Sequence, residues 1–247
     1  MRNLFKYAQD YCQQPFDQTH VRFRKLKLLE QIKKYPHEKI LEIGCGLHPF
    51  FEDFTDFKEL ILIEPSTVFF NNAVGLLKNS PELNSKVIFM HDYFESVFDK
   101  ISTYELDFII LSNLLHEIEN VSSFLKVLHK ICHEDTILHI VVPNAKSFHR
   151  ILAFEMGMID SIYQLSDRNI LLQQHTVFDL ESLSALLVKN GFKIIESGSF
   201  FIKPFSHQQM QDMLEHKIIN KKTLTGFYKM VHYMPELGSE IFVNCKI

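Results

Sequence analysis

KILEIGCGLHPFF, residues 39–51, joins a short apolar run to two closely spaced glycines. The apolar run predicts a buried β-strand. Gly44 and Gly46 predict a tight turn whose backbone a ligand can approach closely. A strand that ends in such a turn is typical of α/β folds in which ligands lie at the carboxyl ends of the strands. His48 and Pro49 are expected to begin the helix that follows the turn.

The rest of the chain repeats this arrangement. From about residue 38, apolar segments alternate with helical patterns, which predicts an α/β fold of three layers, with a mostly parallel sheet between helices. Seven strands are expected, at residues 39–43, 59–65, 86–92, 105–113, 136–144, 193–202 and 238–247. The clearest helical patterns cover residues 120–134 and 179–192.

Three segments do not follow the alternation. Residues 1–37 are expected to form an N-terminal helical cap, with THVRFRKLK (19–27) as a solvated helix face. The main domain then covers residues 38–247. Within it, the stretches at about 145–178 and 203–236 are interpreted as insertions, because they are too long for simple connections.

Length and composition narrow the function classes. The 247 residues are enough for one large domain, and 46% hydrophobic and 23% charged residues are ordinary for a globular protein. A net charge of −4 gives no electrostatic footprint for nucleic acid, and no apolar stretch is long enough to span a membrane. The cysteines are scattered, without zinc-site spacing, so we expect a reduced, cytoplasmic protein without a metal site.

The glycine turn departs from the dinucleotide-binding fingerprint. GxGxxG would require a third glycine where Pro49 stands, and it includes no acid such as Glu42 inside the strand. An acid, a spacer and Gly-x-Gly instead resemble the first motif of class I S-adenosylmethionine-dependent methyltransferases, a seven-strand, Rossmann-like family. His48 replaces the last glycine of that motif. The resemblance covers roughly residues 36–202 and the last ten residues, and it implies that the last strand is antiparallel.

The resemblance also implies the cofactor, S-adenosylmethionine, with S-adenosylhomocysteine as its product. Glu64 matches the acid that accepts hydrogen bonds from both ribose hydroxyls, since a carboxylate makes strong charge-assisted bonds. Asp92 matches the acid beside the adenine, and Tyr93 or Phe94 would lie against that ring. Cys45 is expected to fill space rather than react. The implied cofactor-binding residues are Glu42, Gly44, Cys45, Gly46, Glu64, Pro65, Asp92, Tyr93 and Asn113.

Methyl transfer from a sulfonium requires a positioned acceptor and, for a hydroxyl, a base that removes its proton. His116, just past the fourth strand, is the first candidate for this base, although it is also compatible with a packed helix residue. His149 and His175, in the first insertion, are further catalytic candidates. Arg150 suits a carboxylate or phosphate on the acceptor, or a solvated helix face. The substrate-binding candidates are Tyr11, Arg22, Asn144 and Arg150.

The sequence therefore predicts a methyltransferase that acts on an oxygen, or less readily a nitrogen, of a small metabolite in small-molecule biosynthesis. The two insertions would build the acceptor pocket. The expected partner is a small molecule rather than nucleic acid or a membrane, and a homodimer stays open. Two alternatives remain at this point: an NAD(P)-binding oxidoreductase on a similar sheet, and a catalytically silent methyltransferase-like interaction subunit.

Overall fold

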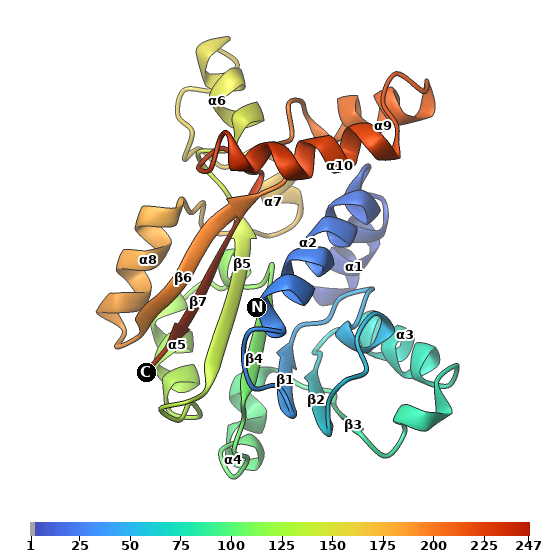
Figure 1. The fold of residues 1–247 in the computed structure, drawn as a ribbon, viewed down its shortest axis with the longest axis vertical. Helices are drawn as coiled ribbons and strands as arrows, with labels where there is room; N and C mark the ends of the chain where they lie inside the picture. Colours follow the sequence, from blue (N-terminus) through green and yellow to red (C-terminus); the bar gives the residue numbers. More distant parts are fainter. Residues whose placement is uncertain (1–2) are drawn as a thin grey trace.

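A seven-stranded sheet forms the centre of the molecule in the computed structural model, which describes residues 3–247 (Figure 1). The strands are β1 (Lys39–Ile43), β2 (Glu59–Ile63), β3 (Val87–Met90), β4 (Phe108–Ser112), β5 (Ile137–Pro143), β6 (Lys193–Phe200) and β7 (Glu240–Lys246). Their order is β3-β2-β1-β4-β5-β7-β6, and β7 runs antiparallel to both of its neighbours. The predicted α/β fold with an antiparallel last strand is confirmed.

The order of the strands places a ligand site. From β1 the chain moves outward through β2 and β3, and it then returns to start again on the other side with β4. In parallel α/β sheets, ligands bind at the carboxyl ends of the strands where this reversal occurs. The glycine turn that follows β1 lies at that point.

Helices cover both faces of the sheet. The α-helices are α1 (Leu4–Cys12), α2 (Asp17–Ile32), α3 (Thr67–Leu77), α4 (Phe98–Ile101), α5 (Val121–His129), α6 (Phe148–Glu155), α7 (Asp167–Leu171), α8 (Leu180–Lys189), α9 (His207–Glu215) and α10 (Lys221–Lys229). Short 3-10 helices are η1 (Phe50–Glu52), η2 (Pro81–Leu83), η3 (Phe94–Val97), η4 (Leu115–Glu117) and η5 (Met230–His232). Helices α4, α5 and α8 pack on one face, and α2 and α3 pack on the other.

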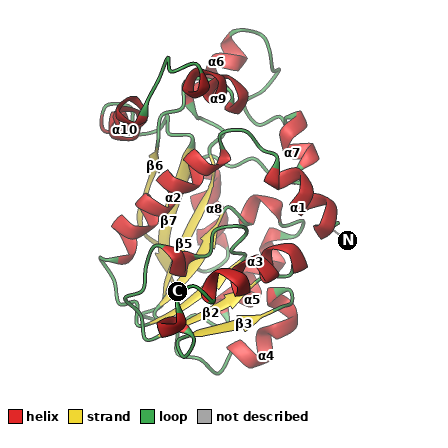
Figure 2. Ribbon diagram, turned by 90° about the vertical axis from the view of Figure 1, so that its right-hand side faces the viewer, coloured by secondary structure: helices red, strands yellow, loops and turns green. Residues whose placement is uncertain are grey.

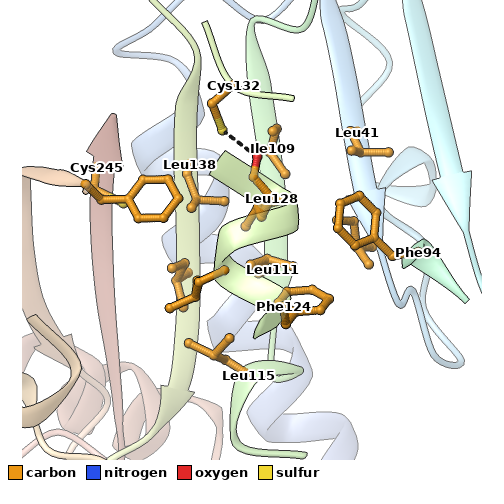
Figure 3. Packing of buried hydrophobic residues seen from close by; sticks show 14 of the residues in the cluster. Leu41, Phe94, Ile109, Leu111, Leu115, Phe124, Leu128, Cys132, Leu138 and Cys245 are labelled. Atoms are coloured by element: carbon orange, nitrogen blue, oxygen red, sulfur yellow. Dashed lines mark hydrogen bonds between the residues drawn. The ribbon is translucent and has the colours of Figure 1, made fainter. Parts of the chain in front are cut away.

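Alternate residues of each strand supply the two cores, because successive side chains of a strand point to opposite faces. Figure 3 shows Leu111 and Leu138 of the sheet beside Phe124 and Leu128 of α5. All four side chains are buried. Burying a side chain of this kind contributes about 1.5–3 kcal/mol each, so this contact is a main source of the stability of the sheet–helix packing.

Helix α2 belongs to the core rather than to the surface. Leu28 and Ile32 pack with strand residues on the second face of the sheet, and Phe23 packs with residues of α9 and α10. The predicted solvated face at residues 19–27 is therefore wrong, because α2 is covered on two sides. Val21, Phe23 and Arg24 are all buried.

The turn after β1 also differs from its prediction. Pro49 precedes a single 3-10 turn, η1, instead of opening an α-helix with His48. Phe50, Phe51 and Phe54 are buried in the same cluster as Leu28 of α2. A compact turn brings these rings onto the sheet face at which α2 already packs.

Helices from the two predicted insertions gather at one end of the sheet. Helices α6, α9 and α10 lie together at the top of both Figure 1 and Figure 2. An aromatic cluster fastens this layer, with Phe201 stacked on Phe23 at 4.5 Å between ring centroids and Phe16 at 6.1 Å from Phe201. The insertions are thus held over the ends of β5, β6 and β7.

Candidate active site

The glycine turn after β1 exposes its backbone to a ligand. Gly44 and Gly46 have φ values of 77° and 57°, in the left-handed region that favours glycine. A Cβ added to Gly46 would meet no atom within 4 Å, so open space lies over the turn. The Gly44 N–H donates to the carbonyl of Ile63 at 2.8 Å, which ties the turn to the end of β2.

Glu64 is the carboxylate at the end of β2. Its Oε1 accepts from the Ser66 N–H at 2.9 Å, and its Oε2 accepts from the Gly46 N–H at 3.2 Å. The Cys45 thiol is a third and weak donor, to Oε2 at 3.8 Å. Because an ionised carboxylate has about four acceptor sites, capacity remains for a ligand's hydroxyls. Burial raises the pKa of Glu64, while the two backbone donors oppose that shift.

Glu42 and Cys45 complete the turn. The Glu42 carboxylate accepts from the Phe50 N–H at 3.0 Å, and burial raises its pKa to about 7. Glu42 therefore fixes the segment that follows the glycines. Burial raises the pKa of the Cys45 thiol well above its ordinary value, so Cys45 is an unreactive thiol that packs within the turn.

Two adjoining hollows meet at the turn and share several lining residues, among them Gly44, Pro65, Leu114 and Glu117. The first, which we call the cleft, has apolar walls that include Ile43, Ile63, Phe94 and Val121. The second, which we call the chamber, continues toward the insertions. Its lining includes Tyr11, Arg24, Asn113, His116, Lys203 and Glu240.

A buried ion pair lies in the chamber. The Arg24 guanidinium donates to Glu240 Oε1 from Nε at 3.0 Å and from Nη2 at 2.5 Å. Asn113, which has a φ of 55° at the end of β4, donates from Nδ2 to the same oxygen at 2.9 Å. These bonds compensate much of the cost of burying the two charges, and they fix the start of β7 against α2.

Basic groups surround this pair. Lys203 Nζ lies 2.8 Å from His207 Nδ1, and the His207 ring lies 4.8 Å from the ring of His20 between centroids. Burial lowers the pKa of His20, His149 and His207, and the charge of Lys203 lowers all three further. Within residues 3–247, no group of three or more His, Cys, Asp or Glu side chains is placed to hold a metal ion.

Comparison with known proteins decides the family of this site. Residues 16–197, most of the chain, match the model of a family described as a methyltransferase domain. The chain belongs to the class I S-adenosylmethionine-dependent methyltransferases. This membership decides against an NAD(P)-binding oxidoreductase, and it makes S-adenosylmethionine the cofactor. A search of curated proteins gave no match.

Solved structures of other methyltransferases share the fold. An S-adenosylmethionine-dependent methyltransferase from Mesorhizobium loti has a TM-score of 0.56 at 11% identity, covering 87% of this chain and 94% of that one. A possible histamine N-methyltransferase from Thermotoga maritima has 0.56 at 15%, covering 91% and 89%. The plantazolicin methyltransferase BamL, solved with S-adenosylhomocysteine, has 0.52 at 15%, covering 99% and 85%.

Most of the cofactor residues predicted from the sequence line the two hollows of the methyltransferase. Glu42, Cys45, Gly46, Glu64 and Asn113 line the chamber, Gly44 and Pro65 line both hollows, and Tyr93 lines the cleft. Asp92 is the exception, because it is exposed, lines neither hollow and accepts a hydrogen bond from the Tyr93 N–H at 2.8 Å.

The predicted catalytic histidines separate. His116 and His149 line the chamber, and the Nε2 of His116 lies 4.0 Å from Glu117 Oε1. Glu117 in turn accepts from the Tyr7 hydroxyl at 2.9 Å. His175 instead lines the cleft and is exposed, because its position in the chain is fixed by a backbone bond to the His116 carbonyl. The structure therefore does not place His175 with the other two.

Not all of the predicted substrate-binding residues of the methyltransferase line the chamber with free donors. Tyr11 lines the chamber, but Arg22 is exposed, with its guanidinium 5.7 Å from the centroid of the Phe23 ring. Arg24 lines the chamber in its place, because residues two apart point to nearly opposite sides of a helix. Asn144 and Arg150 line the chamber, but their donors bind backbone carbonyls at 236, 238, 162 and 164.

Sequence reasoning missed several chamber residues: His20, Arg24, Glu117, Arg168, Lys203, His207 and Glu240. Two of them had a usable signal. Lys203 interrupts the apolar run FFIKPF, and Glu240 opens the buried strand GSEIFVN. A charged residue inside an apolar segment is rarely buried without a partner or a function, so both positions could have been singled out.

Proposed function

We propose that this methyltransferase moves a methyl group to an oxygen, or less readily a nitrogen, of a small acceptor bound in the chamber. The observation that carries the proposal is the shared boundary of the two hollows. The donor would lie along the glycine turn, with its adenine in the cleft and its ribose beside Glu64, which lines the chamber. Its methyl group would then meet an acceptor held in the same chamber, near the boundary that Gly44, Leu114 and Glu117 line. The two similar enzymes named for histamine and plantazolicin support a small-molecule acceptor.

The residues at the turn fit the cofactor. The backbone at Gly46 is open to a ligand, Glu64 retains acceptor capacity for the ribose hydroxyls, and Tyr93 and Phe94 line the cleft for the adenine. When bound, S-adenosylmethionine supplies a methyl group on a sulfonium that is already activated for displacement. The protein's own work is then to orient the acceptor, exclude water and accept a proton.

His116 and His149 are the proposed proton acceptors. A neutral imidazole accepts the proton of a hydroxyl, and burial with the nearby cations keeps His149 neutral at pH 7 by lowering its pKa. His116 lies nearer the shared boundary, since the next residue, Glu117, lines both hollows. His116→Gln and His149→Gln should identify the base through a loss of roughly 10²–10⁴-fold in turnover at unchanged cofactor affinity. His232→Gln, at an exposed position, is the matched control.

The test of transfer itself uses methyl-labelled S-adenosylmethionine and a fractionated metabolite extract. Label is expected in a small compound, which mass spectrometry then identifies. Binding of S-adenosylhomocysteine without any labelled product would instead indicate a catalytically silent subunit.

Within residues 3–247, no helix has the length and apolar character needed to traverse a bilayer. The four free cysteines support the proposed cytoplasmic setting. The proposed role, in small-molecule biosynthesis, follows from the proposed acceptor.

A further inference from the structure

Lys203 is a buried amine without a carboxylate partner. It lies just after β6, its side chain is fully buried, and its Nζ is 2.8 Å from His207 Nδ1. Among residues 3–247, no carboxylate lies within ion-pairing distance of Nζ. Burying an uncompensated charge is costly, and a methionine would fill the same space at no such cost. The lysine therefore requires a reason other than packing.

The other charged groups near Lys203 do not provide it with a counter-charge. Arg24 already holds Glu240, and Arg150 donates to backbone carbonyls. Arg168, from α7, donates from Nε to Gln14 Oε1 at 2.9 Å. Its Nη2 makes a longer contact, of 3.5 Å, with the Asp17 carboxylate. The lining of the chamber around Lys203 thus carries more positive than negative charge. Burial and the charge of Arg168 lower the pKa of Lys203 well below its ordinary value, and the more distant Glu240 carboxylate opposes this shift. An anion bound beside the amine would therefore favour its charged form.

Polar atoms with unused hydrogen-bonding capacity line the same chamber, and two of them belong to histidines whose pKa the charge of Lys203 lowers. Ser147 Oγ, His149 Nδ1 and His207 Nε2 are buried and make no hydrogen bond within residues 3–247. When Lys203 is charged it can only donate, so His207 Nδ1 must accept from it. The ring proton of His207 is then on Nε2, which becomes a buried donor. Buried polar groups of this kind are normally paired, and all three belong to the chamber lining.

We propose that the chamber takes an acceptor that carries an anionic group, a carboxylate or a phosphate, and that Lys203 and Arg168 bind this group with His207 and Ser147 as further donors. This rests on the proposed function, because it names the class of acceptor for the same site. One anion there gives Lys203 a counter-charge and gives the unused donors an acceptor. The methyl group goes to another atom of the acceptor, so the product keeps its negative charge.

The same arrangement provides specificity. A neutral analogue of the acceptor would leave Lys203 buried without a counter-charge, and sites built to pair a polar group discriminate strongly against analogues that lack it. Selection would therefore depend on charge at the far end of the chamber, while the chemistry occurs at the shared boundary with the cleft.

The test uses the full-length protein saturated with S-adenosylhomocysteine and labelled with ¹⁵N in its histidine rings. It is titrated with inorganic phosphate, with acetate and with neutral acetamide. Phosphate or acetate should give saturable ring shifts for His207 and His149, and acetamide should not. The tighter of the two anions identifies the group that the site prefers. Lys203→Met should weaken this binding by roughly ten- to hundredfold, whereas Lys222→Met, the same change at an exposed lysine, should leave it unchanged.

The outcomes separate this inference from the function on which it rests. Lys203→Met replaces a buried amine that has no carboxylate partner by an apolar side chain of similar length, so its unfolding midpoint should be equal to or above that of the wild type. Should that variant fail to fold, Arg168→Gln provides the same measurement. Absence of anion binding to the wild-type protein, or binding to the Lys203→Met variant that is as tight as to the wild type, overturns the inference. A labelled product that is neutral overturns it as well, and methyl transfer would still stand. Failure to bind S-adenosylhomocysteine would overturn the proposed function itself.

Discussion

Replacing Glu64 by alanine should weaken cofactor binding without dismantling the sheet. Glu64 lies at the end of β2, where its carboxylate accepts from the N–H groups of Gly46 and Ser66 and, weakly, from the Cys45 thiol. The remaining sites are available to ribose hydroxyls. Hydrogen bonds to a charged group contribute about 1.5–3 kcal/mol, so affinity for S-adenosylhomocysteine should fall by roughly ten- to hundredfold.

Isothermal titration calorimetry with S-adenosylhomocysteine at pH 7.5 measures this loss directly. Glu38→Ala, an exposed position just before β1, is the matched control and should leave the affinity unchanged. A thermal melt of each apo-protein separates lost binding from lost folding, because the Gly46 and Ser66 donors can turn to water in the variant. Wild-type affinity in a folded Glu64→Ala protein would refute the placement of the ribose at the end of β2.

Three further changes test other parts of the site and the fold. The pKa of Glu42 is about 7, above its ordinary 4.5, so the folded state holds the proton more tightly than the unfolded state, and the stabilisation that results is lost as the pH rises from 4.5 through 7. Relative to wild type, Glu42→Gln should increase the free energy of unfolding by up to about 3 kcal/mol at pH 8 and by little at pH 4.5. Urea unfolding at the two pH values measures the difference. Gly191→Ala should lower the free energy of unfolding by about 1–2 kcal/mol, because φ is 91° and the new Cβ would lie 2.9 Å from His129 Nε2. Gly226→Ala, in the interior of α10 with open space around the new Cβ, should instead raise the free energy of unfolding. Glu240→Gln leaves the buried Arg24 charge uncompensated and should cost about 3–5 kcal/mol, again by urea unfolding.

The sheet was predictable because each strand carries its own signal. Every expected strand from 39–43 to 238–247 is present, although most are shorter than predicted. The segment 105–113, for example, becomes a strand only at Phe108–Ser112, because Glu105 to Asp107 precede the residues that pair with β1 and β5. Apolar periodicity records burial, and the bounds depend on hydrogen-bond partners that local sequence does not contain.

Helix α2 shows what local sequence could not give. Its buried face includes Arg24 and Gln31, which are polar and therefore read as solvent-exposed. Their partners are Glu240 and Asn244, more than 200 residues later in the chain. A pairing at that separation becomes visible only when the sheet has formed. The same reason explains why Arg22 was favoured over Arg24 as the residue that faces the site.

The cofactor half of the site was predictable to a greater depth than the acceptor half. Gly44, Gly46 and Glu64 act through the ends of neighbouring parallel strands, and strand order alone brings them together. The chamber instead draws His20, Lys203 and other residues from several helices and strand ends that pack only in the folded molecule. A charged residue inside an apolar segment can mark a single member, as at Lys203, but sequence spacing does not show that these residues come together.

Two buried basic side chains at the same end of the sheet, Arg24 and Lys203, lead to opposite expectations for their variants. Arg24 has a carboxylate of the chain as its permanent partner, so its role is met in the absence of any ligand. Lys203 has a histidine in place of an acid. If this difference reflects function, removing the partner of Arg24 should cost folding stability, and removing Lys203 should cost ligand affinity alone. A Lys203→Met protein that loses stability as Glu240→Gln does would make the lysine structural, and the anionic acceptor would lose its principal support.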